Sequence, residues 1–213
     1  MPQQQRAIDT RRNALVGSAV VIDRLGYETA TIAEMVHESG ITKGALYFHF
    51  PSKEAVAEAI IAEQAEWLSQ QYGTDDPPVQ TVVDISYAFV EALISDPLMR
   101  ASIRMTIDRA APPESIVHGY SSWITAVTEL LDRARDAGTL KDDVKTSETA
   151  YTITSAVTGL QLTSAALSQR RDLPERVENL WALIIPAVVR PELLPRVEIR
   201  PPQRRRRKNV SPV

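Results

Sequence analysis

Side chains that can bind nucleic acid are concentrated in residues 42–53, TKGALYFHFPSK. Lysine can donate hydrogen bonds to guanine O6 and N7, so Lys43 could read a base edge in a major groove. Tyr47 and His49 can donate to phosphate oxygens, which positions a protein on DNA without reading its sequence. Lys53 stands at the expected start of another helix, where backbone N–H groups already favour an anion. The stretch therefore predicts a contact with DNA, although a single lysine of this kind is more often only a solvated surface residue.

The other residues of this stretch are suited to holding a short helix in place. Thr42 can cap its first turn, and Gly44 and Ala45 are small enough to let the backbone approach another surface closely. A helix this short gains little stability by itself, so it needs anchors. Phe48 and Phe50 are the expected anchors in the core, although an exposed Phe48 could instead contact a thymine methyl group.

A second group of candidate residues places polar atoms where apolar side chains are expected, and this predicts a pocket for a small molecule. Alternatively, a helical threonine can bond its own helix carbonyl, and a tryptophan can be ordinary core. No charged residue belongs clearly to the set, so a neutral ligand is favoured. The candidates are Gln64, Trp123, Thr154, Thr158 and Gln161, with Tyr87 as a weaker addition.

Metal, redox and enzyme chemistry have little support. The chain has no cysteine, which excludes disulfides, zinc–thiolate sites and cysteine nucleophiles. Its histidines, His37, His49 and His118, lack metal-ligand spacing. No convergent set of nucleophile, acid and base is recognisable, so we expect neither an enzyme nor a metal or cofactor site.

The elements that position these residues all read as helices. Apolar residues at steps of mostly three and four predict a first helix over 5–25, with Ile8, Leu15 and Ile22 on the buried face. Gly26 follows as a C-terminal cap.

Residues 31–50 predict two further helices. Thr31 and Glu34 form a capping box, so the second helix should run over 32–39 and end at Gly40. The third helix is the short stretch with Lys43. Two helices joined by a short turn containing glycine describe a helix-turn-helix.

A fourth helix, expected over 52–72 with Ser52 as its cap, carries Gln64 on the same face as Val56, Ile60, Trp67 and Leu68. The remaining helices are expected over 79–95, 97–109, 115–137, 146–168 and 174–189.

The whole chain is therefore expected to be all-α, with about nine or ten helices and no strands. We expect a DNA-binding domain over 1–52, a helical ligand-binding and dimerisation domain over 53–195, and a disordered basic tail over 196–213.

Charge is unevenly distributed. The net charge is −3. Residues 1–70 contain six basic and nine acidic residues, so only the placement of the basic residues favours DNA. The run RRRRK at 204–208 could attract phosphate nonspecifically or serve only solubility. No signal-peptide core and no run of 18 apolar residues is present, which predicts a cytoplasmic protein without a membrane partner, located at the nucleoid when bound to DNA.

Residues 25–60, LGYETATIAEMVHESGITKGALYFHFPSKEAVAEAI, resemble the DNA-binding region of TetR-type bacterial repressors, which covers roughly residues 6–55. The form TKGALYFHFPSKE, together with Gln64 and Trp123, is similar to the γ-butyrolactone autoregulator receptors of actinomycetes.

The resemblance implies a homodimer joined through the last two long helices, with each third helix in a major groove of a pseudo-palindromic operator. Arg6 and Arg11 should then reach the DNA backbone. Equivalents of Gln64, Trp123 and Thr158 hold a lactone or butenolide in such receptors, and ligand entry shifts the fourth helix from its start at Pro51 and Ser52. The genes controlled would belong to secondary metabolism. Alternatives are a regulator that answers another ligand, such as an antibiotic, one that has lost its response, or a helical enzyme.

Overall fold

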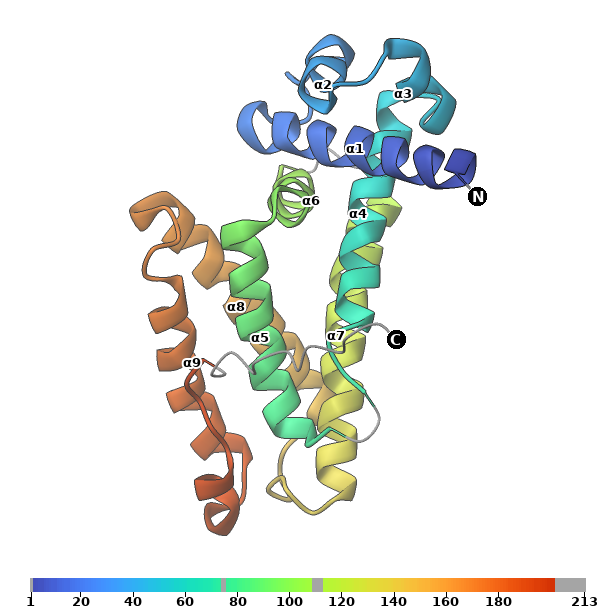
Figure 1. Cartoon of the computed structure of the whole chain (residues 1–213). Coiled ribbons are helices and arrows are strands. Elements are labelled where there is room, and N and C mark those ends of the chain that lie inside the picture. Colours follow the sequence, from blue (N-terminus) through green and yellow to red (C-terminus); the bar gives the residue numbers. More distant parts are fainter. Residues whose placement is uncertain (1, 74–75, 109–112, 202–213) are drawn as a thin grey trace, which may run out of the picture. The chain divides into compact units, whose positions relative to one another are not determined.

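The computed structural model describes residues 2–73, 76–108 and 113–201, and these residues are helical almost throughout (Figure 1). The expected all-α class is confirmed, and the one β feature of the described residues is an isolated bridge between Leu140 and Val189. The helices are α1 (Pro2–Leu25), α2 (Ile32–Ser39), α3 (Lys43–His49), α4 (Lys53–Ser69), α5 (Pro78–Ser95), α6 (Pro97–Ile107), α7 (Pro113–Asp136), α8 (Thr146–Ser168), α9 (Leu173–Val188) and the 3₁₀ helix η1 (Pro191–Arg196).

Side-chain caps fix the starts of the short N-terminal helices. Thr31 and Glu34 form the expected capping box at α2, and Gly40 ends that helix with a φ of 64°, a left-handed conformation that glycine adopts without strain. Thr42 Oγ1 accepts the N–H of Ala45 at 3.1 Å, which begins α3. Helix boundaries in this region therefore follow from local hydrogen bonding, as the sequence predicts.

Several expected helix boundaries, and the expected start of the tail, differ from the structure. Helix α4 ends at Ser69 rather than near residue 72, and α6 ends at Ile107. The predicted end of α6, Arg109, lies outside the described residues. Disorder was expected from residue 196, but Arg196 closes η1, a short tight helix bracketed by two prolines.

The segment after η1 is also held in place. The Gln80 side chain both donates to the carbonyl of Glu198 at 3.0 Å and accepts its N–H at 2.8 Å, because a primary amide can pair with a peptide group in both directions. Tyr87 Oη donates to the carbonyl of Ile199. The arginine-rich run lies outside the described residues.

Contacts within the chain define two compact units, and each is described by itself. Unit 1 contains the residues up to Gly73 together with Glu91–Thr125. Unit 2 contains the residues between Gly73 and Glu91 together with those from Ala126 onward.

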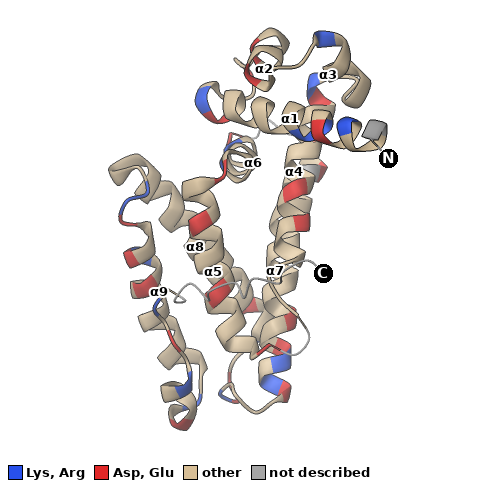
Figure 2. Ribbon diagram, viewed as in Figure 1, with Lys and Arg blue, Asp and Glu red and all other residues tan. Residues whose placement is uncertain are grey.

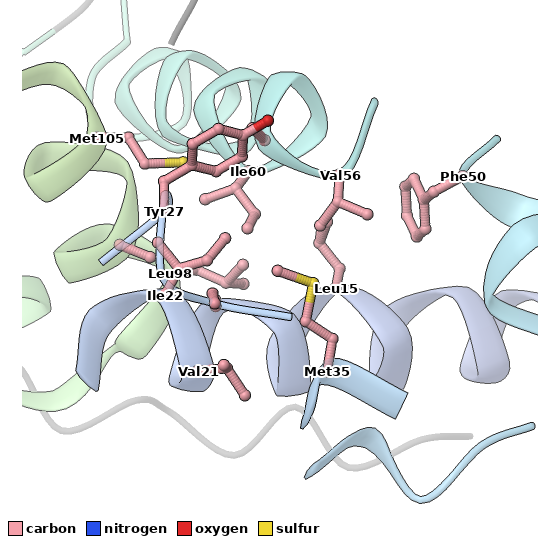
Figure 3. Packing of buried hydrophobic residues seen from close by; sticks show 14 of the residues in the cluster. Leu15, Val21, Ile22, Tyr27, Met35, Phe50, Val56, Ile60, Leu98 and Met105 are labelled. Atoms are coloured by element: carbon pink, nitrogen blue, oxygen red, sulfur yellow. The ribbon is translucent and has the colours of Figure 1, made fainter. Parts of the chain in front are cut away.

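The core of unit 1 joins α1, α2, α3, α4 and α6 (Figure 3). Leu15, Ile22, Met35 and Ile60 are completely buried in it. The prediction that Ile8 belongs to the buried face is wrong, since it is 55% exposed; it precedes the part of α1 that the other helices cover.

Gly17 allows α1 and α2 to cross very closely. A Cβ atom at Gly17 would lie 2.6 Å from both the Cα and the backbone nitrogen of Ser39, and it would also meet the Ser39 hydroxyl. No atom can occupy that position without moving the backbone of α2.

Helix α6 is tied to the end of α1 by two arginines. Arg100 Nε lies 2.6 Å from Asp23 Oδ2, and Arg104 donates to the backbone carbonyl of Asp23. The Arg100 and Asp23 side chains are only 22% and 27% exposed, so solvent screens this pair less than a fully exposed one.

Unit 2 has its own core, in which α8 packs against α9. Trp181 is 1% exposed, and its indole N–H donates to Ser86 Oγ at 2.8 Å, which satisfies the one polar atom of a large buried ring. At the junction of the two helices, Asp172 accepts hydrogen bonds from Ser164 and Ser168 of α8 and from Arg176 of α9.

Candidate DNA-binding surface and ligand site

Two buried side chains anchor α3 to unit 1. Leu46 is completely buried and Phe50 is 3% exposed. The N–H of Phe50 donates to the carbonyl of Leu46 at 2.8 Å, which closes the last turn. The seven-residue helix is therefore held by its neighbours, as its length requires.

The opposite face of α3 is open. Phe48 is 81% exposed and Tyr47 is 41% exposed. The expectation that Phe48 anchors the helix is therefore wrong, because only Leu46 and Phe50 point inward. Lys43 is exposed, with Nζ 5.9 Å from the centre of the Tyr47 ring, and nothing lies within 4 Å of a Cβ built on Gly44.

Other candidates for DNA contact lie next to this open face. The guanidinium of Arg11 lies 5.1 Å from the centre of the Phe50 ring, which links the front of α1 to the end of α3. His49 is half-buried, with its ring edge-on to Phe48 at 5.0 Å. Arg6 is exposed on α1, and Ala45 is half-buried on α3.

Lys53 is engaged within the protein. Its Nζ donates to the carbonyl of Glu28 at 3.2 Å and lies 4.4 Å from the centre of the Tyr27 ring. Glu54 also stands in the first turn of α4, where its own backbone N–H, and then Ser52, hold the pKa of its carboxyl below the usual value. The predicted phosphate position at the start of α4 thus already has a carboxylate beside it.

Acidic residues are unevenly distributed between α3 and α4. The stretch from Thr42 to Lys53 contains no acidic residue, whereas α4 carries Glu54, Glu58, Glu63 and Glu66. Figure 2 shows acidic residues as red bands along α4. Lys43 is the one lysine or arginine of α3. Within unit 1, the open face of α3 is therefore the surface best suited to binding a polyanion.

The ligand candidates of unit 1 are partly buried. Gln64 is 7% exposed, and its Oε1 accepts a hydrogen bond from the buried Ser102 hydroxyl at 2.6 Å. Trp123 is half-buried, and its ring centre lies 6.0 Å from that of Trp67. Ser102 was not predicted as a partner of Gln64. A serine on the apolar face of α6 was the sequence signal that could have indicated it.

Unit 2 contains the more unusual polar group. Gln161 is 1% exposed, and both atoms of its amide lack a hydrogen-bond partner among the described residues, as does the buried hydroxyl of Thr154. Unpaired buried polar atoms cost about 1–3 kcal/mol each, so they are uncommon in a finished core. Thr158, by contrast, donates to the carbonyl of Thr154 at 2.8 Å.

Tyr87 has its hydroxyl occupied by the Ile199 carbonyl, and burial raises its pKa to about 12. It therefore stays protonated, as a donor, at neutral pH. The six ligand candidates thus fall into two groups, Gln64 and Trp123 in unit 1 and the others in unit 2.

In the described residues, no group of three or more histidine, cysteine or acidic side chains could hold a metal ion. None of the helices within the described ranges is long and apolar enough to cross a membrane.

Comparison with protein families accounts for both parts of the chain. Residues 15–60 match the model of the bacterial regulatory proteins of the tetR family, and residues 78–190 match that of the tetracyclin repressor-like C-terminal domain. The chain belongs to the TetR family. It therefore has an N-terminal helix-turn-helix domain followed by a C-terminal helical domain.

Its relatives within the TetR family include receptors of small molecules. The A-factor receptor protein of Streptomyces griseus is 34% identical over 198 residues, which is 93% of this chain and 70% of that protein. A solved γ-butyrolactone receptor described as ArpA-like is 27% identical with a TM-score of 0.75, covering 90% of this chain and 94% of its own.

The CprB protein of Streptomyces coelicolor, solved in complex with its operator, is 27% identical with a TM-score of 0.74, over 90% and 94% of the two chains. TetR regulators bind operator DNA as dimers and bind small-molecule effectors. The resemblance to TetR-type repressors and to γ-butyrolactone receptors is thus confirmed.

Proposed function

We propose that this TetR protein is a ligand-responsive repressor that binds a pseudo-palindromic operator as a homodimer and leaves it when a lactone- or butenolide-type effector binds. The observation that carries the proposal is the open face of α3, where Lys43, Tyr47 and Phe48 are exposed on a helix held by buried residues. Likeness to the A-factor receptor and to a solved γ-butyrolactone receptor supports the effector class, and a role in secondary metabolism is part of the proposal.

In this proposal the residues of the helix-turn-helix have separate tasks. Lys43 reads a base, the exposed ring of Phe48 contacts a thymine methyl group, and Tyr47 and His49 hold phosphates. Arg6 and Arg11 reach the backbone from α1. Lys53 can join them only by leaving the carbonyl of Glu28.

A titration with DNA tests this assignment. The full chain should bind its own upstream region with nanomolar affinity at a site whose half-site centres lie about 34–36 Å apart. Lys43→Ala should cost about 1–3 kcal/mol and relax the preference for one base pair. The matched control is Lys145→Ala, because Lys145 is an exposed lysine between α7 and α8. Equal loss in the two variants would remove Lys43 from the reading role.

The effector is proposed to bind unit 2 through Gln161 and Thr154. Their amide and hydroxyl groups are buried without partners among the described residues, so a ligand with a carbonyl and a hydroxyl group would satisfy them. A neutral ligand suits this set because the set contains no charged residue. Assigning Gln64 and Trp123 to the same effector stays a prediction.

Release from DNA tests the effector site. A panel of butyrolactones, butenolides and unrelated antibiotics should contain a lactone or butenolide that dissociates the operator complex. Gln161→Leu keeps the size of the side chain, so it should bind DNA normally and need at least tenfold more effector. Thr163→Val is the control, since the Thr163 hydroxyl is exposed and bonds its own helix. Release only by an antibiotic would reassign the ligand class.

The dimer is proposed to form through α8 and α9. Both helices expose large apolar side chains, which a soluble monomer would have to leave in water. The four most relevant residues are Tyr151, Leu162, Leu167 and Leu183, with exposed fractions of 62%, 39%, 86% and 76%.

A further inference from the structure

Unit 1 contains a hollow that shares Gln64 with the proposed effector contacts but is otherwise lined by residues without a role in the proposed function. It has a volume of about 310 Å³ and lies where α1, α4 and the start of α6 meet. Ligand pockets in proteins begin at about this size. Arg12, Glu63, Glu66, Trp67, Asp96 and Met99 line it together with Gln64.

Charges around the hollow do not balance. Arg12 Nη1 lies 2.8 Å from Glu63 Oε2, so these two charges form a pair. Glu66 and Asp96 have no cationic partner among the described residues: Glu66 meets only the neutral amide of Gln70, and one oxygen of Asp96 caps α6. Two carboxylates facing one hollow attract a cation rather than a neutral lactone.

The walls of the hollow also suit an organic body. Trp67 presents an indole, the aromatic ring that binds cations best, and its partner ring on Trp123 holds it. Leu98 and Met99 are 4% and 3% exposed and supply apolar surface.

Gln64 adds a polar contact that points to a ligand independently of the charges. The residue is 93% buried and lines the hollow, and Oε1 is taken by Ser102. Its Nε2 has no hydrogen-bond partner among the described residues. This N–H group is accessible to solvent, so it is available to an oxygen atom of a ligand.

We propose that this hollow binds an organic ammonium ion that also carries an ester, ether or hydroxyl oxygen. The cationic head lies against Glu66, Asp96 and the Trp67 ring, and the oxygen accepts from Gln64 Nε2. The cation competes with Arg12 for Glu63, and Arg12 belongs to α1, the helix that packs against α2 and α3. Occupancy therefore acts on the helix-turn-helix without requiring the effector of unit 2.

Calorimetric titration of the full chain with acetylcholine as the probe tests the site. The matched ligand is 3,3-dimethylbutyl acetate, which has the same shape and ester but no charge. We expect acetylcholine to bind at least tenfold more tightly at low salt and to weaken as sodium chloride is added. Equal affinity for the two esters, or no binding of acetylcholine at millimolar concentration, would overturn the proposal.

Variants in the chain test the contacts. Glu66→Gln and Asp96→Asn, which keeps an oxygen to cap α6, should each weaken acetylcholine binding about threefold to tenfold. Arg12→Gln should strengthen it severalfold, because Glu63 then loses its internal partner. Glu58→Gln is the control, since it makes the same charge change at an exposed position of α4 outside the hollow.

These outcomes separate the site from simple charge attraction. If Glu58→Gln and Glu66→Gln weakened acetylcholine binding equally, the site would be rejected. It would also be rejected if the Arg12→Gln protein bound acetylcholine more weakly at an unchanged melting temperature. The titration uses no DNA, so its failure leaves the proposed repressor function untouched.

Discussion

At the scale of single residues, short-range hydrogen bonds from side-chain caps fix where α2, α3 and α4 begin. The caps at Thr31, Thr42 and Ser52 are as expected, because a cap depends on residues within three positions. Phe48 was placed in the core and is exposed, since two aromatic residues two positions apart on a short helix cannot both face inward. The orphaned amide of Gln161 was a candidate by type, but its lack of partners follows only from the packed structure.

Gly17 determines how closely α1 and α2 can approach each other. Gly17→Ala should lower the free energy of unfolding by about 1–3 kcal/mol, because the new methyl group would overlap the backbone of Ser39. Urea denaturation measures the change. Gly44→Ala is the control, because its Cβ meets nothing, and stability should rise there by about 0.5–1 kcal/mol. Equal effects would show that helix propensity, not the α1–α2 crossing, sets the cost.

Asp172 makes folding depend on pH. The hydroxyls of Ser164 and Ser168, and then Arg176, hold the pKa of its carboxyl far below the usual 3.8. The folded state therefore prefers the charged form, and the stabilisation is complete above that usual value and is lost as the pH falls below it. Asp172→Asn should lower the melting temperature at pH 7, and it should lower it by a smaller amount at pH 3, where part of the stabilisation is already lost.

Thermal melting at both pH values checks this expectation. Asp143→Asn is the control, because Asp143 is exposed on the loop between α7 and α8. A constant difference between Asp172→Asn and the unchanged protein at all pH values would contradict the linkage.

At the scale of elements, apolar periodicity and helix-end signals predict all nine α-helices of the described residues, because proline, glycine and caps mark most of their ends. Which helices pack against one another was not predictable from the sequence. The contacts of α6 with α1 and α4 rest on Arg100, Arg104 and Ser102, whose partners lie 38 to 81 positions away in the sequence. The 3₁₀ helix η1 was missed because its two prolines read as loop.

The Asp23–Arg100 pair should couple α1 to α6 measurably. A double-mutant cycle with Asp23→Ala and Arg100→Ala should give about 1–2 kcal/mol, because the pair is half-buried and hydrogen-bonded. The control cycle is Lys145 with Glu148, which are 73% and 70% exposed and should couple by less than about 0.5 kcal/mol. Similar values for the two cycles would show that the α1–α6 pair is an ordinary surface pair.

At the scale of the whole molecule, the exposed apolar side chains of α8 and α9 bear on which surface forms the proposed dimer. The core leaves out Leu183 of α9, which is 76% exposed. Leu183→Glu should therefore give a monomer at low micromolar concentration, since a buried charge without a partner opposes association. Light scattering after gel filtration measures the mass.

The control for this prediction is Ile94→Glu on α5, which makes a similar change at a residue that is 53% exposed. It should leave the mass of the assembly unchanged. A dimeric Leu183→Glu protein would move the proposed interface away from this face.

The open face of α3 also affects how such a protein can change over generations. The outward positions of α3 contribute little to the packing of unit 1: Phe48 is 81% exposed, and a side chain added at Gly44 would meet no neighbour. Substitutions there cost the fold almost nothing, because surface changes away from buried contacts are close to neutral for stability. A duplicated copy of this gene could therefore acquire a new binding preference one residue at a time, while Leu46 and Phe50 keep the helix in place.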